Sequence, residues 1–69
     1  MSYFSCNLKR LRIEKKIPQK DLSNLLNITL RQYQRYEKGE QEPNIEKLTT
    51  LADFFNVSID YLLRKADNL

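Results

Sequence analysis

Signals that start and stop helices follow one another at short intervals along this chain of 69 residues, and they restrict it to short helices. Thr29 and Gln32 have the spacing of a capping box, in which each side chain bonds the backbone of the other residue. Asn44 and Ser58 are residue types that cap helix starts, and Gly39 tolerates the left-handed backbone that ends a helix. No segment has the pattern of a strand. We therefore expect an all-α fold.

One hydrophobic core should join these helices, because 69 residues are too few for two independent cores. We interpret residues 1–69 as a single compact domain with its core over about residues 5–63. The five expected helices lie at about residues 5–16 (with Ser5 as N-cap), 19–26, 29–38, 44–56 and 58–63. The apolar residues whose helical spacing predicts an inward position are Phe4, Leu8, Leu11, Leu22, Leu25, Leu26, Tyr33, Tyr36, Ile45, Leu48, Leu51, Ala52 and Phe55.

The chain lacks the side chains that most catalytic and metal sites need. It has no histidine and one cysteine, Cys6, so it can form neither a Cys/His zinc site nor a histidine-activated nucleophile. Its single glycine excludes a Gly-rich phosphate loop. We expect no enzymatic activity, no metal and no cofactor, and we interpret Cys6 as a small packing residue.

No part of the sequence predicts export or membrane insertion. The N-terminal residues 1–5 lack the charged start and apolar stretch of a signal peptide, and no apolar run approaches the ~20 residues that span a bilayer. We therefore expect a cytoplasmic protein with no membrane partner. The chain also ends soon after the fifth predicted helix, so we expect no sensor domain and no small-molecule effector.

The charges are distributed unevenly along the chain. Residues 8–38 hold nine Lys or Arg and three Asp or Glu, a balance of +6, whereas residues 39–69 hold three and six, a balance of −3. A basic segment attracts a polyanion when its charges also share one face.

Residues 19–38 have the layout of a DNA-binding helix-turn-helix, in which a turn joins two short helices. If Tyr33 and Tyr36 point into the core, four polar side chains share the opposite side of the third helix: Arg31, Gln34, Arg35 and Lys38. That helix face holds no acid. An α-helix fits the major groove of B-DNA, where Arg recognises guanine and Gln recognises adenine. The predicted base-reading residues, with Arg31 and Arg35 foremost, are Thr29, Leu30, Arg31, Gln32, Gln34 and Arg35.

Phosphate contacts should come from other positions, because they orient the protein without reading sequence. Gln19 opens the second helix, where backbone N–H groups and the helix dipole favour an anion. Lys20 lies beside it, and Lys38 and Arg10 extend the positive surface. We predict that these four residues contact the DNA backbone.

Residues 8–63 resemble the phage-repressor and Cro helix-turn-helix family, also called XRE-type. The resemblance rests on residues 8–12 (LKRLR), 19–22 (QKDL), 36–39 (YEKG), Pro43, Leu48, 51–52 (LA) and 57–63 (VSIDYLL). It implies the five-helix fold of lambda-repressor-like DNA-binding domains, a phosphate contact at Gln19 and major-groove contacts from residues 29–35. It also implies a structural ion pair between Arg12 and Glu37.

Several positions depart from the family pattern, among them Ser23 in place of the usual Ala of the second helix and Asn27 in place of the usual Gly of the turn. Pro18 stands where Ser or Thr commonly caps the second helix, so that helix start should lack a side-chain cap. Glu40 and Glu42 lie in the loop that often approaches phosphate in this family, and their charge opposes side-chain contacts to the DNA backbone there.

One module of this size covers a single half-site, so specific binding should require a homodimer on a palindromic operator. The predicted dimer residues are Phe54, Tyr61, Leu62, Leu63 and Leu69, and the alternative is that these residues close the monomer's own core. The first expectation is a transcriptional regulator that binds specific sequences of double-stranded DNA and acts as a repressor. The alternatives are an antitoxin that represses its own operon and a protein-interaction module without DNA binding.

Overall fold

The structure is a computed structural model that describes residues 3–66. Its helices are α1 (Phe4–Glu14), α2 (Gln19–Leu25), α3 (Leu30–Glu37), α4 (Ile45–Phe55) and α5 (Ile59–Leu63). Over residues 3–66 the chain forms no strand. The prediction of an all-α, five-helix fold is therefore confirmed. The predicted dimer residue Leu69 lies outside the described residues.

The predicted helix starts are made by side-chain caps. The Thr29 hydroxyl accepts a hydrogen bond from the Gln32 N–H at 3.1 Å, and the Gln32 side chain accepts one from the Thr29 N–H at 3.1 Å. The Asn44 and Ser58 side chains each accept a bond from the backbone N–H three residues further along, at 2.9 and 3.0 Å. These bonds satisfy N–H groups that have no partner within the helix, so α3, α4 and α5 begin where the sequence predicts.

The start of α1 differs from the prediction. Ser5 does not cap it: the helix begins at Phe4, and the N-cap residue Tyr3 makes no side-chain cap bond. The reason is the burial of Phe4, whose ring packs edge-on against Tyr36 with the ring centres 6.4 Å apart. The helix also ends earlier than expected, at Glu14, because Lys16 adopts a left-handed conformation with φ of 57°.

The core contains most of the predicted inward residues, but two predictions were wrong. Leu25 is 40% exposed, because the buried side of the short helix α2 is formed by Leu22 and Ser23 and continues to Leu26, the residue after the helix. Ile45 is 72% exposed: it shares a face with Leu48 but stands on the first turn of α4. The interpretation of Cys6 as a packing residue was also wrong, since its side chain is exposed.

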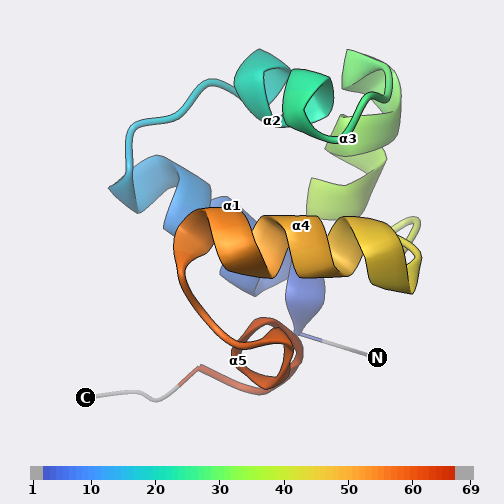
Figure 1. The fold of residues 1–69 in the computed structure, drawn as a ribbon. Helices are drawn as coiled ribbons and strands as arrows, with labels where there is room; N and C mark the ends of the chain where they lie inside the picture. Colours follow the sequence, from blue (N-terminus) through green and yellow to red (C-terminus); the bar gives the residue numbers. More distant parts are fainter. Residues whose placement is uncertain (1–2, 67–69) are drawn as a thin grey trace.

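The helices are arranged around α1, which contacts both α3 and α5. Figure 1 shows α2 and α3 together at one end of the molecule and α5 at the other, with α1 and α4 between them. The contact with α5 depends on Asn7, a fully buried residue whose side-chain amide donates to the carbonyls of Tyr61, Leu62 and Arg64 at 3.2, 2.9 and 2.8 Å. Asn7 therefore satisfies carbonyls at the end of α5 that its short helix leaves without partners.

Within residues 3–66, every helix is too short or too polar to cross a membrane.

Candidate nucleic-acid interface

Helix α3 presents one buried and one exposed face. Tyr33 and Tyr36 are 0% and 4% exposed and point into the core, as predicted. On the opposite side one surface pocket is lined by Arg31, Gln34, Arg35, Lys38 and Glu40. The spacing therefore brings together the four basic and amide side chains that the sequence placed on one face.

The first turn of α3 is also accessible. Leu30 is 41% exposed, and Thr29 and Gln32 are exposed although their side chains form the capping box. Leu30 is therefore a surface residue at the N-terminal end of α3 and contributes little to the core. All six predicted base-reading residues lie on α3 or at its N-cap.

Gln19 joins the start of α2 to the exposed side of α3. Its side-chain amide donates to the Glu37 carboxylate at 3.0 Å, and its carbonyl oxygen accepts a hydrogen bond from the Gln34 amide at 3.2 Å. Pro18, the N-cap of α2, makes no side-chain cap bond, as its sequence predicts. Lys20 follows on the first turn of α2 and is exposed. The Gln19 side chain is thus fixed in position beside Gln34.

The structure places Arg10 away from this surface. Its guanidinium donates to the Tyr61 hydroxyl at 3.2 Å and to the Asn7 side chain at 3.0 Å, and it lies 3.6 Å from Glu14. The neighbouring residue Lys9 lines a pocket on the α3 side together with Gln19, Gln34, Glu37 and Lys38. Successive helix residues point about 100° apart, so Lys9 lies beside the exposed face of α3 while Arg10 points toward α5. This position of Lys9 was not predicted.

An ion pair fixes the orientation of α3 on α1. The Arg12 Nε and Nη2 groups donate to the two carboxylate oxygens of Glu37 at 2.5 and 3.2 Å, and the Arg12 Nη1 group donates to the Ile17 carbonyl at 3.0 Å. The side chains of Arg12 and Glu37 are only 15% and 5% exposed. The ion pair implied by the family resemblance is therefore present, with the two-bond geometry that holds a guanidinium and a carboxylate in one plane.

The Glu37 carboxylate accepts two further bonds, from the Gln19 amide at 3.0 Å and from the Tyr33 hydroxyl at 2.5 Å. Burial by itself would raise the pKa of Glu37, but the bonds from Arg12, Tyr33 and Gln19 outweigh it and lower that pKa below its usual value. Burial and the bond to this carboxylate raise the pKa of Tyr33, which keeps its hydroxyl a donor.

We expect acid to weaken the fold through Glu37. The pKa of Glu37 is about 4.3 in the unfolded chain and lower in the folded state. Between these two pKa values the unfolded chain binds more protons than the folded protein. The stabilisation from Glu37 is therefore fully present above the unfolded pKa, and it is lost as pH falls through the folded pKa. Thermal melts of wild type and Glu37→Gln between about pH 6 and about pH 3 measure how the contribution of Glu37 to stability depends on pH. The stability difference between them should shrink toward acid, and a difference that stays constant would contradict the assignment.

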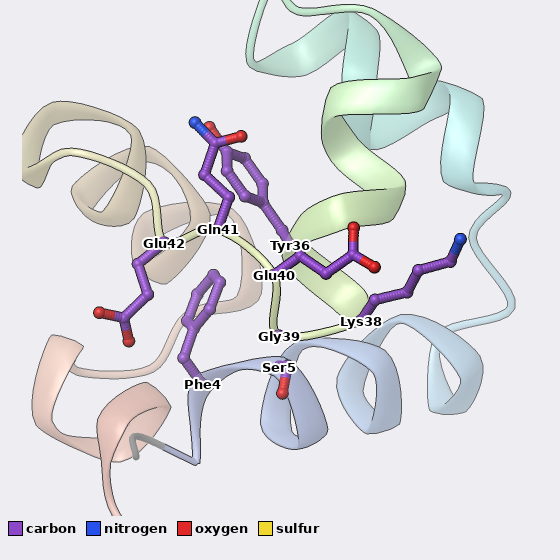
Figure 2. Close-up of a pocket in the computed structure, with 8 residues that line it drawn as sticks. All are labelled: Phe4, Ser5, Tyr36, Lys38, Gly39, Glu40, Gln41 and Glu42. Atoms are coloured by element: carbon purple, nitrogen blue, oxygen red, sulfur yellow. The ribbon is translucent and has the colours of Figure 1, made fainter.

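A further contact reaches the exposed face from the loop after α3. The Glu40 carboxylate lies 3.7 Å from Arg35 Nε, and both side chains are about half exposed. The α3 face itself is free of acid over residues 30–36, as predicted, but the return of Glu40 toward this face was not predicted. Figure 2 shows the Glu40 side chain on the α3 side of this loop and the Glu42 side chain pointing the other way.

The predicted dimer residues lie in different environments. Phe54 and Leu63 are 47% and 40% exposed. Tyr61 is half-buried, and the guanidinium carbons of Arg10 and Arg64 lie 5.6 and 5.4 Å from its ring centre. Leu62 is fully buried in the monomer core, because α5 turns it toward α1, so it has no surface to offer a second copy.

The chain has the geometry of a DNA-binding helix-turn-helix protein. The short helix α2 is followed by a turn, in which Asn27 has a φ of 56°, and then by α3 with its exposed basic face. A family model described as helix-turn-helix matches residues 8–62. The chain therefore belongs to the helix-turn-helix family of the phage-repressor and Cro, or XRE, type. This is a family of DNA-binding proteins and not of enzymes.

Several known proteins are similar to this chain. YqaE of Bacillus subtilis, an uncharacterised HTH-type transcriptional regulator, is 40% identical over 65 residues, or 94% of this chain and 56% of YqaE. The cryptic phage CTXphi transcriptional repressor RstR of Vibrio cholerae is 33% identical over 64 residues, or 93% of this chain and 58% of RstR. The crystal structure of a transcriptional regulator from Listeria innocua matches with a TM-score of 0.90 and 36% identity, over 100% of this chain and 64% of that one. The chain thus spans somewhat more than half the length of these curated relatives.

Proposed function

We propose that this protein regulates transcription in the cytoplasm by binding double-stranded DNA, with α3 in the major groove. The observation that carries the proposal is the exposed face of α3, on which Arg31, Gln34, Arg35 and Lys38 stand together. The opposite face is fixed by two buried tyrosines and by the Arg12–Glu37 pair. A rigid helix whose long polar side chains share one face can present them together to base edges.

Within this face, Arg31 and Arg35 are the proposed guanine readers, because a guanidinium can bond O6 and N7 of guanine at the same time. Gln34 offers an amide of the kind that recognises adenine, and its bond to Gln19 restricts its conformation. Thr29, Leu30 and Gln32 complete the proposed base-reading set at the N-terminal end of α3, and the Leu30 side chain is suited to a thymine methyl group.

The proposed phosphate contacts come from Gln19 and Lys38, which border the exposed face, and from Lys20, an exposed residue next to Gln19 on α2. Lys9 joins this set because it lines the same pocket as Gln19 and Lys38. Arg10 is left out, since its guanidinium is engaged with Tyr61, Asn7 and Glu14. Such contacts position the protein and add sequence-independent affinity.

A homodimer that represses transcription from a palindromic operator is the specific form we propose. Support comes from the exposed apolar residues Phe54 on α4 and Leu63 on α5, from the small footprint of one module, and from the repressor named among the similar proteins. A reporter placed behind the selected operator tests the sign of regulation, and higher expression in the presence of the protein would contradict repression.

Selection of bound sequences from random DNA tests the proposed recognition. Wild type should select a defined sequence, and Arg31→Ala should lose preference at one base-pair position per half-site, by about 1–3 kcal/mol, while the other positions keep theirs. Lys65→Ala is the control, because it removes one positive charge from an exposed position beyond α5. A wild type that selects no sequence would contradict the proposed function and favour an interaction module without DNA binding.

A further inference from the structure

The acidic residue Glu40 stands on the proposed DNA-binding surface, where a negative charge opposes the approach of phosphate. It lines the same surface pocket as Arg31, Gln34, Arg35 and Lys38. Its nearest charged partner is Arg35, with 3.7 Å between the Glu40 Oε1 and Arg35 Nε atoms. An exposed pair of this kind contributes little to the stability of the fold, so we consider its effect on DNA binding.

The backbone at the end of α3 determines where Glu40 lies. The Glu40 N–H donates to the Arg35 carbonyl at 3.0 Å, and the Gly39 N–H donates to the Tyr36 carbonyl at 3.2 Å. Gly39 has a φ of 76°. These are the two bonds and the left-handed residue of a Schellman motif, the common way to end a helix. The motif brings residue 40 back beside residue 35, so the ion pair follows from how the helix ends.

The contact engages one edge of the Arg35 guanidinium. Glu40 approaches through Nε, and the guanidinium carries five N–H donors in a rigid, planar fork. The two terminal nitrogens Nη1 and Nη2 therefore stay able to bond O6 and N7 of one guanine. A carboxylate on the Nε edge restricts the rotation of a long, half-exposed side chain and reduces the conformational freedom that it loses on binding.

We propose that Glu40 is a positioning residue for Arg35 and that it increases sequence discrimination at a cost in total affinity. This inference rests on the proposed function. The carboxylate holds Arg35 for one base contact, and it repels phosphates when the protein lies on DNA out of register. Both effects favour the correct site over random DNA, whereas a neutral residue at position 40 would allow Arg35 to bond phosphates and other bases.

The test compares Glu40→Gln with Glu42→Gln, which removes the same charge two residues further along the loop. Glu42 lines a cavity with Phe4, Pro43 and Ile45, and Figure 2 shows its side chain pointing away from α3. Fluorescence anisotropy measures the binding of each protein to the selected site, to the same site changed at the base pair whose preference Arg35→Ala abolishes, and to random-sequence DNA.

Both variants should bind random DNA about two- to five-fold more tightly, because each removes a charge that repels phosphate. Only Glu40→Gln should also lower the affinity ratio between the selected and the changed site, by about two- to five-fold. In an Arg35→Ala background the affinity ratio is already lost, so Glu40→Gln should there change only the sequence-independent affinity for DNA. The melting temperatures of wild type and Glu40→Gln should agree.

Two results would overturn the inference. The first is a Glu40→Gln protein with the wild-type affinity ratio, and the second is an equal loss of that ratio in Glu42→Gln. Each of them leaves the proposed function intact, provided that wild type selects a sequence. A wild type that selects none would remove both the proposed function and the inference.

Discussion

Replacing Glu37 by alanine is expected to lower the free energy of unfolding by about 3–5 kcal/mol. The carboxylate accepts hydrogen bonds from Arg12, Gln19 and Tyr33. Its removal leaves the Arg12 guanidinium, only 15% exposed, without its counter-charge. It also leaves the hydroxyl of the buried Tyr33 without an acceptor. An uncompensated charge costs far more than the pair contributed, because water cannot replace the lost partner in the interior.

Thermal unfolding measures this effect. In a domain of this size, 1 kcal/mol lowers the melting temperature by about 4–8 °C, so Glu37→Ala should melt roughly 12 °C or more below wild type. Glu14→Ala is the matched control, because it removes an exposed carboxylate that lies 3.6 Å from Arg10 on α1. This exposed pair should contribute at most about 1 kcal/mol. Equal melting temperatures for Glu37→Ala and wild type would contradict the structural role of the ion pair.

The helix boundaries could be predicted because their causes are local. A capping box needs only Thr29 and Gln32, three residues apart, and the left-handed residues Asn27 and Gly39 are types that tolerate positive φ. The start of α1 could not be predicted in the same way. Its N-terminal residue is set by the packing of Phe4 on Tyr36, which are distant in sequence, and this contact overrides the capping preference of Ser5.

The directions of individual surface side chains were the hardest feature to predict. Arg10 and Lys9 are adjacent in a basic run, yet Arg10 faces α5 and Lys9 faces α3. Helical spacing alone shows that they diverge, but only the position of α5 against α1 shows which one meets the proposed DNA-binding surface. Glu40 was predicted as an acid in a loop, and its return to Arg35 depends on the hydrogen bonds that end α3.

Leu62 was predicted at the dimer interface but belongs to the core of the monomer. Its type and its place on the last helix are compatible with either a dimer contact or the core. The buried Asn7 decides between them, because its three bonds to the carbonyls of residues 61, 62 and 64 hold α5 against α1. A buried amide that satisfies a distant helix end leaves no signature in hydrophobic periodicity, so the sequence analysis did not find it.

Binding of the proposed dimer to its operator is expected to weaken about 10³- to 10⁴-fold when salt rises from about 50 mM to about 200 mM. With roughly six to eight phosphate contacts per dimer, the logarithm of affinity should fall against the logarithm of salt concentration with a slope of about −5 to −7. The contacts that we expect to produce this slope come from Lys9 and Lys38, which border the exposed face of α3, and from the exposed Lys20 on α2. Titrations at several salt concentrations measure it.

Two variants separate the charged contacts from the neutral one. Lys20→Ala should make the slope shallower by about one for each protomer bound, since one released counterion is lost from each half-site. Gln19→Ala should weaken all sequences alike and leave the slope unchanged, because the amide carries no charge. Half-sites about 10–10.5 base pairs apart place both copies of α3 on one side of the duplex. The dimer would be contradicted by a slope near half the expected value together with sedimentation that shows one protein molecule bound per DNA. The phosphate contacts proposed for a single protomer would still be supported by that result.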